Sequence, residues 1–395
     1  MTDTVPRIAV IGAGIIGAAV ARQLALHGAR VWLLDRDDRA DATSRISFAW
    51  VNAHRKREPR YHRLNVAGMA EHHVLARQLD PHRRWHFPTG HLEYATEPDH
   101  AARVEQDIRE LRELDYPARR VDRAWAQAHE PWARIPDSAA ILAFFPSEGF
   151  VLPGVLGDAL IDHARALGVQ VGLNAEVLRI VDRDSHVDVM AADGSALPVD
   201  RVVICAGRWT ERLAAGLGLP VPLVAADGPT SAATAFQART APLPVDITGV
   251  VTTSVGNFRP DVGGRLVFQA HDLDDEADPN VVPPAHITAE MRSRLAAILR
   301  TGERGIEVDV ESTIVGKRAL PVDGVTIAGY VDERHAVYAV ATHSGVTLGP
   351  LLGRLVAEEL TGDRESPLLA TFRPDRFAGR TDVPAVPKLL VQGGD

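Results

Sequence analysis

Three glycines near the start of the chain could hold the diphosphate of a nucleotide. Gly12, Gly14 and Gly17 form the pattern GxGxxG in the segment Gly12-Ala13-Gly14-Ile15-Ile16-Gly17. In this motif the first glycine permits a tight turn, the second lets backbone N–H groups approach a pyrophosphate, and the third lets a helix pack closely on its strand. Asp35 follows Gly12 by 23 residues, near the spacing of a carboxylate that accepts hydrogen bonds from a ribose hydroxyl. These residues predict a dinucleotide site.

A strand, a helix and a second strand must position this motif. Residues 7–11 have the composition of a short buried strand, and residues 15–27 that of a helix with small apolar residues on its buried face and Gly28 as its C-cap. Residues 29–34 form the second predicted strand, which ends at Asp35. The agreement of these elements with the motif argues against an ordinary glycine-rich turn.

The composition narrows the class of protein. The chain has 395 residues, enough for two domains or one elaborated domain, and a net charge of -9, which argues against a sequence-independent nucleic-acid binder. Its single cysteine, Cys205, excludes an intrachain disulfide and a thiolate metal cluster, so we expect no metal and a cytoplasmic location. Neither a signal-peptide pattern nor an apolar run of membrane-spanning length is present, so we expect no membrane span.

Further elements follow along the chain. Residues 60–79, 98–114, 154–167 and 348–360 are expected to form helices, and residues 90–94, 201–207 and 336–341 to form strands. Residues 226–315 contain β-branched runs, prolines and a hairpin-like turn at 260–264, which together predict an antiparallel sheet. Because an α/β pattern both precedes and follows this block, two interleaved domains are expected.

Separate stretches of the sequence carry a resemblance to a known family. They are the N-terminal GxGxxG, the small-residue strand at 202–209, the closing stretch at 316–324, and the pairs Thr43-Ser44 and Ser147-Glu148 with their neighbours. Together they resemble the FAD-dependent D-amino-acid oxidase superfamily, to which glycine oxidase and sarcosine oxidase belong. The similarity extends over essentially the whole chain, but residues 226–315 carry no signature of a particular substrate.

The resemblance implies a fold of the α/β class with α+β insertions. In it, a Rossmann-type FAD-binding domain is interleaved with an antiparallel-sheet substrate domain. We assign residues 1–80, 147–225 and 316–395 to the FAD-binding domain, and residues 81–146 and 226–315 to the substrate domain.

The resemblance also implies a reaction. A hydride passes from a carbon next to an amine nitrogen to the flavin N5, leaving an imine that water can hydrolyse, and the reduced flavin is reoxidised, usually by O2. The flavin supplies the redox chemistry, whereas the protein supplies position and electrostatics. The cysteine that links flavin in sarcosine oxidase-like proteins is missing, and no histidine falls where histidyl-linked relatives carry theirs, so non-covalent FAD is expected.

Several residues beyond Ile15 and Ile16 are expected at the cofactor. They are Arg36, Thr43, Ser44, Ser47, Phe48, Ala206, Gly207, Trp209, Gly345, Val346 and Thr347. The N-terminal N–H groups of the closing helix could face the flavin pyrimidine edge, and Gly349 and Pro350 suit the first turn of that helix. Trp50 is expected to pack near the flavin ring, and Lys56 does not match the lysine that promotes oxygen reactivity in sarcosine oxidase-like enzymes.

Arg318 and His343 are the expected catalytic residues. In glycine and D-amino-acid oxidase-like proteins an arginine in the stretch equivalent to 316–324 clamps the substrate carboxylate, which a planar guanidinium suits. Ala319 stands here where the family commonly has proline, and a surface or salt-bridge role for Arg318 stays open. His343 could hold positive charge for oxygen activation, bind substrate, or have a structural role under the flavin.

These residues favour an FAD-dependent amine or amino-acid oxidase, or a dehydrogenase of the same type, acting on a small molecule with O2 or another electron acceptor. Two alternatives remain. An FAD-dependent hydroxylase shares the GxGxxG but normally has a Gly-Asp pair before the last helix, where this chain has Thr342-His343-Ser344. A redox-inactive FAD-binding subunit of a larger complex would need neither Arg318 nor a helix terminus facing the flavin.

Overall fold

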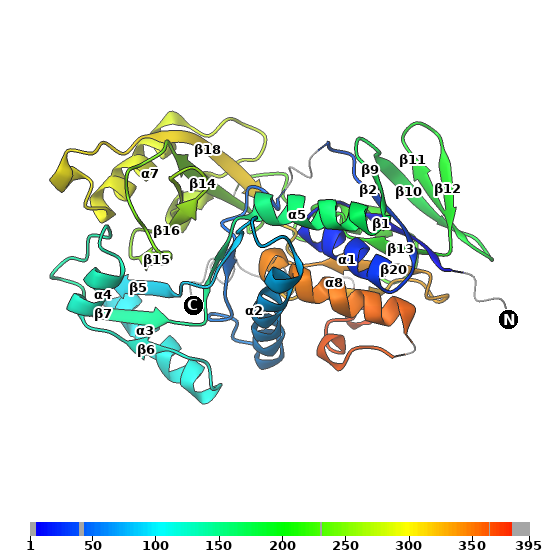
Figure 1. Ribbon diagram of the computed structural model, residues 1–395, viewed down its shortest axis with the longest axis horizontal. Coiled ribbons are helices and arrows are strands. Elements are labelled where there is room, and N and C mark those ends of the chain that lie inside the picture. Colours follow the sequence, from blue (N-terminus) through cyan, green and yellow to red (C-terminus); the bar gives the residue numbers. More distant parts are fainter. Residues whose placement is uncertain (1–4, 39–42, 230, 363, 381–395) are drawn as a thin grey trace.

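A computed structural model describes residues 5–38, 43–229, 231–362 and 364–380. The strands form two large sheets that lie in different lobes of the molecule, with long helices beside the first sheet (Figure 1). No helix among the described residues is both long and apolar enough to cross a membrane.

The first sheet has six strands in the order β19-β20-β13-β1-β2-β9. Their bounds are Ile327–Tyr330 for β19, Val337–Ala341 for β20, Arg201–Ile204 for β13, Arg7–Ile11 for β1, Arg30–Leu34 for β2 and Gln170–Gly172 for β9. All neighbours pair in parallel except β19 and β20. After β1 the chain builds β2 on one side and later β13 on the other, which creates the switch point where open parallel sheets bind ligands.

The two faces of this sheet are covered differently. Ile8 and Val10 of β1 belong to a core with the helices α1 (Ile15–Leu26), α5 (Pro153–Ala166) and α8 (Gly345–Thr361). Ala9 and Ile11 point to the other face, where they join a core with the antiparallel strands β10 (Val177–Asp182), β11 (Val187–Ala191) and β12 (Ala196–Val199). Since side chains alternate along a strand, the apolar stretch of β1 after Arg7 is buried on both sides.

The second sheet has eight strands in the order β18-β14-β17-β16-β15-β5-β7-β6. Their bounds are Val310–Lys317 for β18, Thr234–Thr240 for β14, Arg265–Gln269 for β17, Gly256–Asp261 for β16, Val250–Thr253 for β15, His91–Ala95 for β5, Ile141–Phe145 for β7 and Arg119–Arg120 for β6. Only β5 and β15 pair in parallel within it. Residues 81–146 and 226–315 supply nearly all of its strands, and the domain boundaries themselves stay a prediction.

Helices also cover the second sheet, and a small sheet lies between the lobes. The helix α7 (Ala285–Ile298) packs its apolar residues against Phe236, Phe258 and Phe268, and α3 (Pro98–Glu113) and α4 (Arg123–His129) lie near β5 and β7 (Figure 1). The strands β3 (Trp50–Val51), β8 (Gly149–Val151) and β4 (His86–Phe87) form the small sheet, and α2 (Pro59–Gln78) packs on α8.

Most predicted elements agree with the structure, including the Rossmann-type α/β class and the hairpin at 260–264. The closing helix is a correction, because α8 begins at Gly345 and Pro350 lies inside it and not in its first turn. Proline has no N–H to donate to the carbonyl four residues before it. The buried His72 contacts that carbonyl instead, with 2.9 Å between its Nε2 and the oxygen of Val346, so α8 can run on through the proline.

The contact between α1 and α8 depends on glycine. A Cβ atom on Gly353 would lie 2.7 Å from the Cβ and 2.9 Å from the backbone oxygen of Ala19. Because part of this obstacle is backbone, the helices would have to move apart to admit a side chain. Gly157 of α5 has nothing within 4 Å of the same position.

We therefore predict opposite effects for two glycine-to-alanine substitutions in helices. Gly353→Ala should lower the free energy of unfolding by about 1 to 3 kcal/mol through overpacking, whereas Gly157→Ala should raise it by up to about 1 kcal/mol, the gain in helix propensity. Urea unfolding followed by circular dichroism measures both. A Gly353→Ala protein as stable as the parent would contradict the close approach of α1 and α8.

Candidate active site

A cavity of about 330 Å³ lies at the carboxyl ends of β1, β2, β13 and β20 and extends to β14, β16 and β17 of the second sheet. It is lined by both expected catalytic residues, Arg318 and His343, and by nearly all of the expected cofactor residues. The latter are Gly12, Gly14, Ile15, Ile16, Asp35, Arg36, Thr43, Ser44, Ser47, Phe48, Ala206, Gly207, Trp209, Gly345, Val346 and Thr347. Residues more than 300 positions apart in the sequence thus meet in one place.

Gly12 and Gly14 form the floor of the cavity at the start of α1. Gly12 has φ +102°, and a Cβ there would lie 2.4 Å from the backbone oxygen of Cys205. A Cβ on Gly14 would lie 3.0 Å from Ser44 Oγ. No side chain caps α1 at Gly14, and its first turn has no acidic residue. Ser44 accepts from the Ile15 N–H, so the other N–H groups of the first turn and the positive end of the helix dipole are open to an anion.

Gly17 is not among the residues that line the cavity, and its assignment to the cofactor stays a prediction. Its missing side chain lets α1 lie directly against the loop, because a Cβ at this position would be 1.8 Å from the backbone oxygen of Gly12. The third glycine of the motif therefore serves helix packing, as the motif's geometry requires.

Asp35 lies at the end of β2 and holds the loop together. Its Oδ2 accepts a 2.6 Å hydrogen bond from the Ala13 backbone N–H, and its Oδ1 accepts one of 3.0 Å from Asp37 N–H. Each carboxylate oxygen has a second lone pair, so the group can still accept from a ligand in the cavity. Its place beside the glycine loop is the one that a ribose-binding carboxylate requires.

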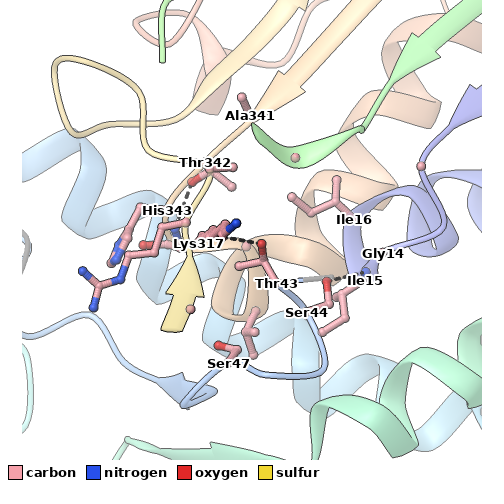
Figure 2. A pocket seen from close by; sticks show the side chains of 18 of the residues that line it. Gly14, Ile15, Ile16, Thr43, Ser44, Ser47, Lys317, Ala341, Thr342 and His343 are labelled. Carbon is pink, nitrogen blue, oxygen red and sulfur yellow. Dashed lines mark hydrogen bonds between the residues drawn. The ribbon is translucent and has the colours of Figure 1, made fainter. Parts of the chain in front are cut away.

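Thr43 and Ser44 connect the glycine loop to β18. Thr43 Oγ1 donates a 2.5 Å hydrogen bond to the Lys317 backbone oxygen, and Ser44 Oγ accepts one of 3.3 Å from Ile15 N–H (Figure 2). In the same view Gly14 and Ile15 lie at one end of the drawn site, and Lys317 and His343 lie at the other. The cavity is thus elongated, with the two hydroxyls between its ends.

Trp209 presents its ring near the Asp35 end, between two guanidinium groups. Arg36 Cζ lies 3.7 Å and Arg208 Cζ lies 3.6 Å from the ring centroid. Burial and the neighbouring Arg36 lower the pKa of Arg208 to about 10. Cations stacked on an aromatic face are attracted to its π-electrons, which fixes the indole against the cavity wall.

The segment from Ser47 to Trp50 is held by an arginine that the sequence analysis did not identify. Arg259 of β16 is fully buried, donates to the Phe48 backbone oxygen, and donates a 3.2 Å hydrogen bond to that of Ser47. Ala49 has φ +57°, a conformation that L-residues rarely adopt. An arginine inside the predicted antiparallel block gives no local signal of this contact, because the two segments are more than 200 residues apart.

The first turn of α8 faces the cavity through Gly345, Val346 and Thr347. Ser344 precedes the helix without capping it, and its Oγ accepts a 2.9 Å hydrogen bond from the Tyr61 hydroxyl. Thr347 Oγ1 donates to the Trp50 backbone oxygen at 3.2 Å. The position of this second helix terminus is therefore fixed by α2 and by β3.

Arg318 follows β18 and lines the end of the cavity away from Asp35. Its backbone N–H donates to the Ala233 oxygen at 2.8 Å and its Nη1 to the Ala232 oxygen at 3.3 Å. It forms no salt bridge with any residue that the structure describes. Burial lowers the pKa of this guanidinium from its ordinary value, although Asp274 opposes the effect. Most of the guanidinium's donors remain available to a ligand.

His343 is half-buried beside this arginine. Burial lowers the pKa of His343 well below its ordinary value, and the nearby charges of Arg318, Lys56 and His271 act in the same direction. The imidazole is therefore neutral at physiological pH in the protein without ligand. This favours a hydrogen-bonding role over the permanent cation that the sequence also allowed.

A row of amide side chains, which the sequence analysis missed, forms the wall on the second sheet. Gln237, Gln269 and Asn257 lie on the neighbouring strands β14, β17 and β16 and all line the cavity, and Asn257 is paired with Gln269. Gln269 Nε2 donates to Gln237 Oε1 at 3.2 Å. At the end of this row His271 contacts the buried Asp274, with 3.1 Å between Nδ1 and Oδ2. No local pattern in the sequence signals this row, because it forms only when the three strands pair.

A second missed feature is a buried network behind the cavity wall. Glu148, fully buried, accepts hydrogen bonds from Trp50 Nε1 at 3.0 Å and from the Tyr116 hydroxyl at 2.8 Å. His54 Nδ1 lies 3.1 Å and His91 Nδ1 lies 3.3 Å from its carboxylate oxygens. Burial alone would raise the pKa of Glu148, but His54 and His91 hold it well below its usual range.

Glu93 carries the network's second buried carboxylate. Arg55 donates to it, His100 Nε2 lies 2.8 Å from its Oε1, and His54 Nε2 lies 3.6 Å from its Oε2. Burial would lower the pKa of His54, yet Glu148 and Glu93 raise it to about 9. The spacing of His54, His91 and Glu93 would also suit a metal ion. Since Arg55 and the His54 cation balance the two carboxylates, we interpret the group as an ion-pair network.

Comparisons with known proteins agree with this geometry. The family model described as FAD dependent oxidoreductase (DAO) matches residues 7–359. The bifunctional protein MnmC of tRNA 5-methylaminomethyl-2-thiouridine biosynthesis from Thiobacillus denitrificans is 29% identical over 94% of this chain and 59% of its own. The present chain thus spans less than two thirds of that relative. Glycine oxidase from Geobacillus kaustophilus is 25% identical over 95% of this chain and 98% of its own.

Solved structures share the fold. The crystal structure of glycine oxidase from Geobacillus kaustophilus has a TM-score of 0.80 at 24% identity and covers 95% of this chain and 100% of its own. L-amino acid deaminase from Proteus vulgaris, with its specific insertion sequence deleted, also has a TM-score of 0.80, at 19% identity over 94% of each chain. At these identities the likeness shows a common architecture.

The buried network predicts a pH-dependent stability. His54 has a pKa of about 9 in the folded state against an ordinary value of 6.5, so its stabilising charge is fully present below pH 6.5 and is lost as the pH rises through 9. The difference corresponds to about 3 kcal/mol. The stability advantage of the parent over His54→Asn, measured by urea unfolding, should therefore shrink by that amount between pH 6 and pH 9.5. A difference that stays constant with pH would refute the His54 cation.

Proposed function

Because the chain belongs to the FAD dependent oxidoreductase family (DAO), we propose that it oxidises a C–N bond of an amino acid or amine. In this proposal a hydride passes from the carbon next to nitrogen to the flavin N5, the substrate leaves as an imine that water hydrolyses, and O2 reoxidises the flavin. Its FAD is held without a covalent bond. Its single cysteine is the basis for a cytoplasmic location.

The cavity has the features that FAD requires. The glycine loop, which a Cβ at Gly12 or Gly14 would obstruct, would hold the pyrophosphate at the start of α1. Asp35 would bind the ribose, and Trp209 would lie at the adenosine side with Arg36. The N–H groups of Gly345, Val346 and Thr347 would meet the pyrimidine edge of the flavin, where the helix dipole favours negative charge.

Arg318 is the observation that carries the choice of an amino acid. It lines the cavity beside His343, and within the described ranges no carboxylate forms a salt bridge with it, although Asp274 acts on it electrostatically. A ligand carboxylate would stabilise a guanidinium in this position, because it can accept two parallel hydrogen bonds from it. A carboxylate there would place the neighbouring amine-bearing carbon near His343.

His343 would orient the substrate amine by a hydrogen bond. Because it is neutral, it does not repel an ammonium substrate, and its lowered pKa makes it a weak base. A carboxylate bound to Arg318 would offset one of the charges that lower this pKa, so substrate binding would make the imidazole more basic. The residues of this chain thus position the substrate and can hold its proton, while FAD when bound supplies the hydride acceptor.

The alternative functions are less well supported. A hydroxylase normally has a Gly-Asp pair where this chain has Thr342-His343-Ser344, and a redox-inactive subunit would need no unpaired Arg318. MnmC is named for tRNA modification, so the likeness to it would favour a macromolecular substrate. A net charge of -9 does not favour nucleic acid binding, so we propose a free small molecule. Anaerobic bleaching of the flavin by amino acids, followed by peroxide formation on adding O2, tests the whole proposal.

Non-covalent FAD gives a direct prediction. The purified protein should be yellow, and heat or acid should release all of its FAD into the supernatant, because Cys205 is buried at the end of β13 with a raised thiol pKa and is unsuited to attachment. Absorption of the supernatant and pellet measures the partition. Flavin that stays on the denatured chain would contradict this prediction.

Replacing Arg318 should separate substrate capture from cofactor binding. Arg318→Ala should keep its FAD but lose about thirty-fold or more in kcat/KM for an amino-acid substrate, because truncating one partner of a desolvated ion pair costs about 2 to 5 kcal/mol. Arg318→Lys should restore little, since lysine offers a point charge in place of a planar fork. Steady-state kinetics on FAD-loaded variants measures this. An unchanged kcat/KM in folded Arg318→Ala would point to an uncharged amine.

A further inference from the structure

We propose that the substrate end of the cavity contains a second anion subsite centred on Lys56, so that the preferred amino-acid substrate carries two carboxylates. Arg318 would bind the carboxylate next to the reacting carbon, and Lys56 would bind the distal one. This inference rests on the proposed oxidation of an amino acid and names the class of that substrate.

The carboxylates that line the cavity all lie at one end, where Arg36 and Arg212 pair with two of them. These carboxylates are Asp35 and Asp37, which follow β2, and Glu176, which precedes β10, so all three belong to the Rossmann-type lobe at the end where the ribose would lie. Lys56, Lys317 and Arg318 line the cavity as well, and none of them forms a salt bridge with a described residue. Asp274, which contacts His271 and acts electrostatically on Arg318, offsets part of this charge, so the end around His343 keeps an excess of positive charge.

Lys56 and Arg318 reach this end from different directions. Lys56 comes from the loop before α2, where its Nζ lies 6.0 Å from the Tyr61 ring centroid, and Arg318 comes from the end of β18. Both line the same cavity as His343 and, with His271, act electrostatically on it. The two cations thus lie near one imidazole but come from different parts of the chain. This arrangement suits a ligand that carries two separate anionic groups.

FAD does not account for the second cation. Its diphosphate would lie at the glycine loop, at the other end of the cavity from His343 (Figure 2). A substrate with a single carboxylate would be satisfied by Arg318 alone. Lys56 is half-buried, and a lysine in a partly desolvated cavity without a counter-ion costs free energy that a bound anion recovers.

The amide row supplies the remaining wall of this subsite. Gln237 and Asn257 are almost fully buried, and Gln269 already donates to Gln237, so the row presents N–H groups from three neighbouring strands. Amide N–H groups can donate to carboxylate oxygens without adding charge. A substrate with a long apolar side chain would leave these buried N–H groups without hydrogen bonds, which costs binding free energy.

Two kinds of amino acid have this chemistry. One is an acidic amino acid with a primary amine, and the other is an N-carboxyalkyl amino acid, in which a secondary amine lies between the carboxylates. In either case one C–H and one N–H bond are lost: the hydride passes to FAD and the proton leaves the nitrogen. Water hydrolyses the resulting imine to an oxo acid and an amine or ammonia.

The subsite can be tested by binding, independently of turnover. Calorimetric titration of the FAD-loaded protein with glutarate and with butyrate compares two and one carboxylates on similar chains without an oxidisable amine. We expect glutarate to bind about 10- to 100-fold more tightly, the range for a hydrogen bond to a charged group. Lys56→Met should reduce this ratio to near one, and Lys56→Arg should retain part of it.

Arg60→Met is the matched control. Arg60 lies four residues along the same segment, is exposed and does not line the cavity, so its loss removes one positive charge without touching the subsite. The ratio should stay at the parent value in this variant. FAD content and thermal unfolding of all variants exclude misfolding, and if Lys56→Met fails to load FAD, Lys56→Gln is measured in its place.

Turnover then distinguishes the two substrate classes, acidic amino acids and N-carboxyalkyl amino acids. Flavin reduction by glutamate is compared with norvaline, and that by N-(carboxymethyl)glycine with N-methylglycine. Equal affinity for glutarate and butyrate, or a preference that survives in Lys56→Met, would overturn the subsite. A loss of O2 reactivity in Lys56→Met with the binding ratio intact would also overturn it and assign Lys56 to reoxidation. Tight glutarate binding without flavin reduction by any amine would keep the subsite and refute the proposed oxidation.

Discussion

The buried carboxylate of Glu148 is the constraint on which the site depends. It accepts hydrogen bonds from Trp50 and Tyr116 and contacts His54 and His91, which come from three separate parts of the chain. A buried charge is tolerated only when its partners are complete. The network therefore fixes the segment that follows Ser47, and this segment forms one wall of the cavity.

This fixed segment has a strained backbone, and the strain is offset by its contacts. Ala49 and Arg55 have φ values of +57° and +63°, which cost free energy for residues with a Cβ. Arg259 holds the carbonyl groups before Ala49, and Arg55 pairs with buried Glu93. The turn at Arg55 brings Lys56 to the cavity, so the position of the proposed anion subsite follows from the same ion pairs that hold the wall.

The parts of the structure that could be predicted from sequence are those encoded locally. The glycine loop, α1 and Asp35 lie within 35 residues, and their spacing alone specifies the βαβ geometry. The predicted start of α8 is too late, because Pro350 suits a first helical turn. The contact that permits Pro350 inside the helix joins Val346 to His72, which is 274 residues away in the sequence. The Glu148 network, Arg259 and the amide row depend on pairings of distant strands, which no local pattern in one sequence reveals.

The polarity of the cavity also explains why its two ends come from different sheets. Binding a diphosphate needs open N–H groups, which the carboxyl edge of a parallel sheet supplies where a helix begins. Selecting a small polar substrate needs side chains at fixed spacing, which neighbouring strands of the second sheet supply through Gln237, Gln269 and Asn257. Arg318 stands where β18 leaves that sheet and returns to the first, so the residue proposed to bind the reacting end of the substrate lies at the junction that sets its distance from the cofactor.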